Sequence, residues 1–220
     1  MNFNFPKITV ITGHYGCGKT NVAVNIALKL AESQKVTVVD LDIVNPYFRT
    51  ADFGELFESK GIKLVTPMYA NSNLDIPALS FDLGGIVNGE GSVIIDVGGD
   101  PEGATALGRY GDQLKSRDDL SLYCVVNKYR YLTSTADEAT ELLAEIKAAS
   151  GLPCNGIINN SNLGALTDNR TVKDSLEYAE QVAKAAGSPL LFTCSEEKNL
   201  DGITPAMPVN IYVKPLWEQI

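Results

Sequence analysis

The stretch ITVITGHYGCGKTNVAVNIA, residues 8–27, joins an apolar run, a glycine-rich turn and a helical pattern. Its centre has the spacing Gly13-x-x-x-x-Gly18-Lys19-Thr20 of a phosphate-binding loop. Glycines let the backbone turn tightly and direct several N–H groups at one anion, and the following helix adds the positive end of its dipole. The lysine reaches the β- and γ-phosphates, and the threonine hydroxyl binds Mg²⁺. We therefore predict a nucleotide site here rather than a simple glycine-rich helix cap. The predicted contact residues are Gly13, His14, Tyr15, Gly16, Cys17, Gly18, Lys19, Thr20 and Asn21.

Two acidic residues follow the next apolar strand, in VTVVDLDIVNPYFRT. Asp40 and Asp42 are two positions apart, so on an extended chain their carboxylates point to the same side. Beside a phosphate loop, one acid is placed to support the Mg²⁺ shell and the other to orient an attacking water. The alternative is a pair of solvated acids that cap the following helix. We assign Asp42, together with Lys19, to catalysis, and Asp42 is also a candidate metal ligand.

The motif GSVIIDVGGDPEG places Asp96 at the end of another apolar strand. A carboxylate is needed there, opposite Thr20, to support Mg²⁺ through a water molecule. An amide on a glycine hinge beside the γ-phosphate can sense whether that phosphate is present. We therefore predict a switch at Gly98, Gly99 and Asp100. A strand-end turn alone would account for the glycines but not for the acid.

Asparagines follow two later strands. NGIINNSNLG ends a strand at Asn159 and Asn160, whose amides offer both a donor and an acceptor to a base edge, although asparagines also favour turns. VVNKYR contains Asn127 and Lys128, but the guanine-binding motif Asn-Lys-x-Asp would need an aspartate where this chain has Arg130. The sequence therefore argues against guanine.

The segment NPYFRT, residues 45–50, is a candidate surface for a partner or substrate, with Arg49 facing phosphate. The alternative is that Tyr47 and Phe48 pack in the core while Arg49 is solvated. We favour this alternative on the usual burial of these residue types.

Short β-rich runs alternate with helical patterns along the chain. The expected strands are 7–13, 35–41, 62–66, 92–97, 120–127, 155–159, 189–194 and 209–213. The expected helices are 18–33, 50–59, 75–87, 102–115, 135–149 and 170–186. Strands separated by helices indicate βαβ units and a parallel sheet, whose ligands bind at the carboxyl ends of the strands. The residues above cluster at those ends, and the length favours one domain, residues 1–220.

Composition excludes several classes of protein. The chain has 220 residues, 45% of them hydrophobic, and a formal net charge of -9. Clustered Lys and Arg are absent, as is a basic amphipathic tail, so we expect no nucleic-acid partner and no membrane partner. No apolar run reaches the ~18 residues of a membrane span, and MNFNFPK lacks the pattern of a signal peptide. The four cysteines are far apart and suit reduced thiols, so we expect a cytoplasmic protein.

The order of these motifs resembles the MinD/ParA/nitrogenase iron protein group of P-loop NTPases, also called the CobQ/CobB/MinD/ParA nucleotide-binding domain. The resemblance is carried by GHYGCGKT, DLD, DVGGD and GIINNSN. It implies a three-layer α/β/α fold with a mostly parallel sheet of seven or eight strands, and ATP with Mg²⁺ as ligands. By the same resemblance Asp42 orients the attacking water, Asp96 supports Mg²⁺ and Asn160 contacts adenine.

The chain also departs from this group. Relatives that form nucleotide sandwich dimers usually carry a second lysine directly after the first loop glycine, where this chain has His14. A neutral imidazole supplies less positive charge and a shorter reach, so we expect slow turnover, and His14 is either a solvated residue or one that faces nucleotide or a dimer partner.

Three functions follow, in order of preference. The first is a slow nucleotide switch or carrier ATPase that acts with an unidentified protein partner and that can form a homodimer. The second is a kinase or ATP-dependent ligase for a small-molecule substrate, similar to dethiobiotin synthetase. The third is a module that binds nucleotide with little hydrolysis.

Overall fold

The structure, a computed structural model, describes residues 3–42, 49–66, 82–99 and 101–213 of the chain. Its strands are β1 (Ile8–Thr12), β2 (Val36–Leu41), β3 (Lys63–Val65), β4 (Ser92–Val97), β5 (Leu120–Val126), β6 (Cys154–Asn159), β7 (Leu190–Ser195) and β8 (Ala206–Pro208). Its α-helices are α1 (Lys19–Ala31), α2 (Gly54–Ser59), α3 (Leu83–Asn88), α4 (Pro101–Gly108), α5 (Gly111–Lys115), α6 (Ala136–Ser150), α7 (Asn169–Lys173) and α8 (Leu176–Ala186).

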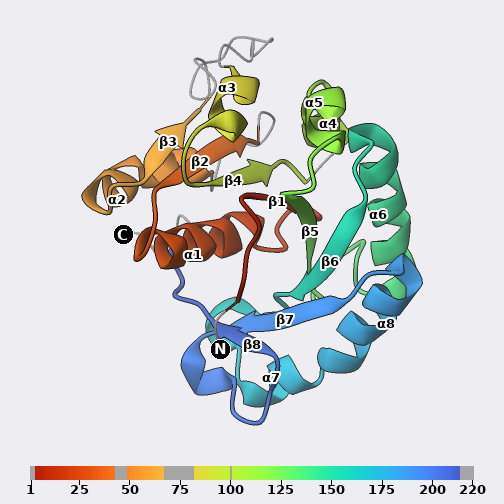
Figure 1. The fold of residues 1–220 in the computed structure, drawn as a ribbon. Helices are drawn as coiled ribbons and strands as arrows, with labels where there is room; N and C mark the ends of the chain where they lie inside the picture. The colour runs from red at the N-terminus through yellow and green to blue at the C-terminus, as the bar shows by residue number, and fades with distance from the viewer. Residues whose placement is uncertain (1–2, 43–48, 67–81, 100, 214–220) are drawn as a thin grey trace.

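The strands form one parallel sheet in the order β3-β2-β4-β1-β5-β6-β7-β8 (Figure 1). The chain leaves β1 toward β2 on one side, and later leaves β4 toward β5 on the other side. The carboxyl end of β1 therefore lies where the winding direction reverses, which is where open α/β sheets bind ligands. The predicted fold class is confirmed, because helices cover both faces of this eight-stranded sheet (Figure 1).

Alternating residues of the central strands point to opposite faces of the sheet and form separate parts of the core. Ile94 packs against α1, whereas Ile95 packs on the opposite face with α3, α4 and α5. A third cluster joins β5 and β6 to α6 and α8. Because Asp96 is two residues beyond Ile94, its side chain lies on the α1 face, and the register of β2 and β4 places Asp40 directly beside it. The pleat therefore directs both acids toward the helix that follows the glycine loop.

Seven of the expected strands are confirmed to within two residues at either end. The eighth is wrong: the strand is Ala206–Pro208, and the segment 209–213 is not a strand. Pro208 ends the strand because it has no N–H to continue a ladder. The segment after Val209 instead bonds to asparagines of α1.

Two expected helices are interrupted. The 170–186 pattern is split into α7 and α8 where the Ser175 hydroxyl donates to Val172 O at 2.7 Å, a local bond that competes with helix bonding. The 102–115 pattern is split into α4 and α5, and Gly108 of α4 contacts Ala149 O of α6 so closely that a Cβ would collide. The 50–59 pattern is a 3₁₀ turn, Thr50–Phe53, followed by α2. Of the 75–87 pattern, α3 occupies the described part, and residues 75–81 lie outside the described residues.

Candidate nucleotide-binding site

The glycine loop follows β1 directly and leads into α1. Gly13, Gly16 and Gly18 have φ angles of 140°, 73° and 90°, which other residues rarely adopt, so the loop geometry requires these glycines. Gly13 also lies so close to the Val125 carbonyl of β5 that a side chain would collide. The sequence therefore places the loop amides at the N-terminus of α1, as predicted, in a geometry suited to an anion.

Lys19 is the charged residue of this loop. It is 5% exposed, and its ammonium donates to His14 O at 3.4 Å. Gly99, from the turn after β4, lies against the same group, because a Cβ built on it would be 2.7 Å from Lys19 Nζ and 2.6 Å from Tyr15 N. The structure thus brings the predicted switch glycine into contact with the loop. Asp100 lies outside the described residues.

Thr20 and Asp96 meet as the sequence predicted. The Thr20 hydroxyl donates to Asp96 Oδ2 at 2.8 Å, while Asp96 Oδ1 is buried and has no hydrogen-bond partner. Burial raises the pKa of Asp96 to about 8, with Asp40 and Asp42 adding to the rise and Lys19 opposing it. An unsatisfied buried carboxylate oxygen beside a threonine hydroxyl fits a hydrated Mg²⁺ ion, which prefers oxygen ligands. These residues therefore fit the metal that the loop motif implies.

Asp40 and Asp42 do not form an equivalent pair. Asp40 is fully buried and accepts from Arg49 Nε at 3.2 Å and from the backbone N–H groups of Asp42 and Ala51 at 2.9 Å and 3.0 Å. Asp40 therefore anchors the chain after β2, and Asp42 lies two residues further on and is 3% exposed.

Arg49 departs from the favoured expectation that it is solvated. It is 2% exposed, and its Nε pairs with Asp40 Oδ2 at 3.2 Å. The sequence carries no signal for this pair, because the nine-residue separation has no periodicity. Tyr47 and Phe48 lie outside the described residues.

Asn160 reaches the glycine loop from the end of β6. Its amide donates to Cys17 O at 2.8 Å, and it lies so close to Gly18 that a side chain there would collide. Asn159 instead points into the core, where its amide donates to Ser175 Oγ at 2.9 Å. The structure therefore places Asn160 at the site, in a bond that holds the loop.

Asn21, on the first turn of α1, is bonded to the chain's C-terminal segment. Its amide donates to Asn210 O at 3.0 Å, and its oxygen accepts from Tyr212 N at 2.8 Å. Asn25, one turn later, adds bonds to both backbone groups of Asn210. The sequence predicts a nucleotide contact for Asn21 and carries no signal for this link, which joins residues 189 and 191 positions apart.

The loop between β5 and α6 adds one more cation. The Arg130 guanidinium lies against Gly16, with Nε and Cζ 3.6 Å and 3.7 Å from the position of a Cβ on that glycine. Burial raises the pKa of the Cys17 thiol, while the positive charges of Lys19 and Arg130 oppose that rise. Sequence reasoning used Arg130 only as a missing aspartate.

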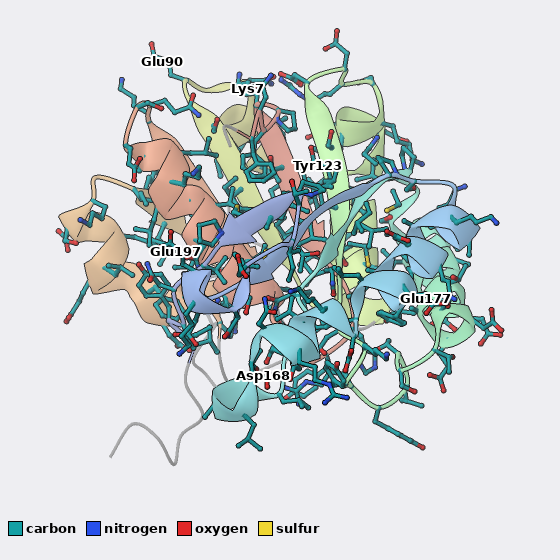
Figure 2. All side chains as sticks on the ribbon, turned by 90° about the horizontal axis from the view of Figure 1, so that it is seen from below. Lys7, Glu90, Tyr123, Asp168, Glu177 and Glu197 are labelled. Carbon is teal, nitrogen blue, oxygen red and sulfur yellow. The ribbon has the colours of Figure 1, made fainter. Side chains whose placement is uncertain are left out.

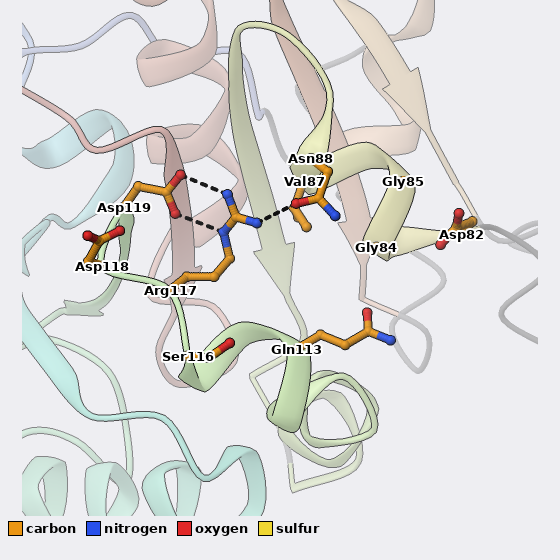
Figure 3. A pocket seen from close by; sticks show the side chains of 10 residues that line it. All are labelled: Asp82, Gly84, Gly85, Val87, Asn88, Gln113, Ser116, Arg117, Asp118 and Asp119. Atoms are coloured by element: carbon orange, nitrogen blue, oxygen red, sulfur yellow. Dashed lines mark hydrogen bonds and ion pairs between the residues drawn. The ribbon is translucent and has the colours of Figure 1, made fainter.

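A cavity of about 760 Å³ lies elsewhere, at the amino edge of the sheet (Figure 3). Arg117 is its principal cation, and this side chain is already bonded to both oxygens of Asp119 at 2.8 Å and to Asn88 Oδ1 at 2.7 Å. In Figure 2, Lys7 and Glu90 mark this edge of the sheet, and Asp168 lies at the opposite end of the molecule. The cavity thus lies at the opposite edge of the sheet from the loop, and its arginine is already paired with a carboxylate of the same chain.

Other chemistry finds little support in the described part of the chain. There, no group of three or more His, Cys, Asp or Glu residues is placed to hold a metal ion. The four cysteines are free thiols, and three of them, Cys17, Cys124 and Cys194, are buried. Among the described helices, none has both the length and the apolar character needed to span a membrane.

The sheet, the glycine loop and the Thr20–Asp96 pair together define a P-loop nucleotide-binding scaffold. No family model and no curated protein matches the sequence.

Solved structures do match the fold. The chain is similar to cell division protein FtsY from Thermotoga maritima (TM-score 0.58, 19% identity, 89% of this chain and 64% of that one). It is also similar to signal recognition particle receptor FtsY from Elizabethkingia anophelis in complex with GDP (0.57, 16%, 91% and 61%). A third match is signal recognition particle 54 kDa protein from Aeropyrum pernix K1 in complex with GDP (0.56, 17%, 88% and 42%). The chain thus spans less than two thirds of each of these chains, and the likeness supports the fold.

Proposed function

We propose that this chain is a Mg²⁺-dependent nucleotide switch of the MinD/ParA type that binds ATP, hydrolyses it slowly and acts with a partner. The observation that carries the proposal is the contact of four residues at one loop. Lys19 and Thr20 begin α1, Asp96 ends β4 and bonds Thr20, and Gly99 touches the lysine. A γ-phosphate at this place would meet the groups that bind it and the turn that reports its presence.

Each residue has a defined role in the proposed reaction. The loop amides and Lys19 hold the phosphates in position, and phosphoryl transfer depends mostly on such positioning and on charge stabilisation. Mg²⁺, held near Thr20 and Asp96, would neutralise charge on the phosphate oxygens. Asp42 orients the attacking water or acceptor group, because Asp40 is committed to Arg49.

Slow hydrolysis follows from the residue at position 14. His14 Nδ1 lies 3.0 Å from Tyr15 O, so the imidazole is bonded within its own loop and requires its proton on Nδ1. Held there, the ring does not reach across to a partner as a second loop lysine would. Removal of a cationic finger costs about 10³-fold or more in rate, so a partner is needed to reach fast turnover.

The proposal takes adenine as the base. Adenine is favoured because Arg130 stands where guanine recognition needs a carboxylate to accept the N1–H and N2–H donors of the base. Guanine is the second candidate, because two of the similar solved structures contain GDP. An unbiased comparison of both bases is therefore part of the test.

Exposed apolar side chains on loops that follow the strands support a protein partner. Six large apolar side chains are exposed in the described residues, and five of them lie on the loops after β1, β5 and β6. These five are Tyr15, Tyr131, Leu132, Leu163 and Leu166. Because they follow strands that carry the nucleotide site, a partner or second copy bound there would respond to the nucleotide state.

The test is calorimetric titration of the wild type and Lys19→Ala with ATP, ADP, GTP and GDP in Mg²⁺, with light scattering of each mixture. The proposal expects adenine nucleotides to bind wild type, Lys19→Ala to bind none tightly, and particle mass to rise only with ATP. Adenine binding without a change of mass, with turnover stimulated by a small metabolite, would favour a kinase or ligase. Tight binding without turnover, unchanged by Asp42→Ala, would favour a binding module. Absence of binding to wild type would refute the proposal.

A further inference from the structure

We propose that Arg130 is a phosphate-binding residue, whose guanidinium supplies from within the same chain a second positive charge at the glycine loop. This inference rests on the proposed nucleotide site and assigns to it a residue from a separate loop, between β5 and α6. The guanine-binding motif Asn-Lys-x-Asp associates position 130 with the base. The contacts of Arg130 associate it with the phosphates instead.

Contact with the loop is the first support. Arg130 Nε, Cζ and Cδ lie 3.6, 3.7 and 3.9 Å from the position that a Cβ on Gly16 would occupy. Gly16 has a φ of 73° and stands in the middle of the glycine loop, between Gly13 and Gly18. The guanidinium therefore packs against the loop, and a guanidinium carries five N–H donors.

A well-anchored backbone holds Arg130 there. Its N–H donates to Asn127 O at 3.2 Å and its carbonyl accepts from Thr133 N at 3.3 Å, which makes a compact turn. Thr133 O in turn accepts from the buried Tyr178 hydroxyl of α8 at 2.6 Å. Leu132, within the turn, has a φ of 67°, which costs free energy for a leucine and which the surrounding bonds must offset. A turn fixed in this way presents Arg130 to the loop in one place.

Charge balance gives the second support. Three buried acids, Asp40, Asp42 and Asp96, interact with one another and with Lys19 of the loop, and a nucleotide brings further negative charge. Arg49 is paired with Asp40, and Lys128 of the same turn donates to Asp174 O at 2.7 Å, away from the loop. Lys19 and Arg130 are the cations whose charge acts on Cys17 in the loop. Arg130 thus takes over part of the task that His14 cannot perform.

The chemistry of guanidinium fits phosphate better than base. Arginine is a donor with no acceptor, always charged, and matches phosphate oxygens with a planar fork. If a residue binds phosphate, its removal should weaken the binding of all nucleotides together. A residue that reads the base should instead change the ratio of guanine to adenine affinity.

This difference gives the test. Dissociation constants for ATP, ADP, GTP and GDP are measured by calorimetry in Mg²⁺, at low and high salt, for wild type, Arg130→Ala, Arg130→Lys and Arg130→Asp. The matched control is Lys35→Ala, which also removes one positive charge. Lys35 precedes β2 at the amino edge of the sheet and is paired with Glu90 at the surface. Thermal denaturation verifies that each variant is folded, as expected for an exposed residue.

We expect Arg130→Ala to weaken ATP binding about tenfold at low salt, ADP binding less, and both effects to shrink as salt screens the charge. Arg130→Lys should retain most of the affinity, and Arg130→Asp should weaken the binding of every nucleotide further. Lys35→Ala should bind each nucleotide as wild type does. Unchanged affinity in Arg130→Ala overturns the inference while leaving the proposed function intact. A tenfold gain in the affinity for GTP relative to ATP in Arg130→Asp also overturns the inference, because such a gain would assign position 130 to the base. Absence of any binding to wild type would refute both.

Discussion

Asp96 is a buried carboxyl group whose surroundings disfavour its charge. Its pKa is about 8, well above the value of 3.8 for a free aspartate, mainly because of burial. A folded-state pKa that is raised above the unfolded value means that the folded state binds more protons. Its contribution to stability is therefore fully present below about pH 4 and is lost as the pH rises through about 8.

We therefore expect Asp96→Asn to be more stable than wild type in EDTA, and the difference to grow from pH 5 to pH 8. The amide keeps the shape of the side chain but carries no charge to bury. The measurement is urea denaturation of both proteins at several pH values, and the difference cancels the titration of groups common to both. A difference that stays constant over this range would show that Asp96 ionises normally. In the presence of nucleotide, Mg²⁺ should stabilise wild type and not the variant.

Arg49 and Asp40 form a buried ion pair, so a substitution of either residue should change the stability of the fold. Arg49→Met leaves the Asp40 carboxylate buried without its ion pair, which we expect to cost about 3–5 kcal/mol of unfolding free energy. Adding Asp40→Asn should recover part of this loss, because the amide needs no counter-charge. A double-mutant cycle by urea denaturation at pH 7 measures the coupling. Additive effects would contradict a direct pair.

At the scale of elements, the turn after β4 is the part that we propose responds to phosphate. Gly99→Ala would bring a methyl group to 2.6 Å from Tyr15 N and 2.7 Å from Gly13 O, both backbone atoms that cannot move cheaply. We expect the turn to shift away from the loop, at a cost of about 1–3 kcal/mol, and any nucleotide-dependent rise in mass to disappear. The measurements are thermal denaturation and light scattering with ATP.

The matched control for this change is Gly54→Ala, at the start of α2. Its nearest neighbour, Leu64, would be 3.9 Å from the added methyl group, so there is room for it. Alanine also favours a helix over glycine, by up to about 1 kcal/mol. A loss in Gly54→Ala equal to that in Gly99→Ala would show that the effect is not specific to the turn.

The same elements show what a sequence can predict. The glycine loop could be found because β1, the loop and α1 are contiguous, so that residue spacing alone describes the site. The contact of Thr20 with Asp96 could be inferred because parallel strands end at a common edge. The Asp40–Arg49 pair and the position of Arg130 could not, because each depends on how an irregular loop folds back, and neither has a period.

At the scale of the whole molecule, the end of the chain is tied to the helix that begins the site. Asn25 Oδ1 accepts from Asn210 N at 2.9 Å, and Asn21 Oδ1 accepts from Tyr212 N at 2.8 Å and Val213 N at 3.3 Å. Within the expected eighth strand, Val209 N still donates to Ser195 O of β7, whereas the N–H groups of Asn210, Tyr212 and Val213 donate to asparagine side chains of α1. This arrangement links the C-terminal segment to the first two turns of α1, one residue after Thr20.

The two asparagines make a matched pair for amide hydrogen exchange. Asn25→Ala should speed exchange of the Asn210 amide more than that of the Tyr212 and Val213 amides. Asn21→Ala should have the opposite pattern, with the larger acceleration at Tyr212 and Val213. Each variant is the control for the other, since each removes one side chain from the same helix face. Equal acceleration at all three amides in both variants would mean that the segment detaches as one unit. Binding of nucleotide at Thr20 should then slow exchange in wild type, because it stabilises the first turn of α1, and should have less effect in Asn21→Ala, where that turn no longer holds the segment.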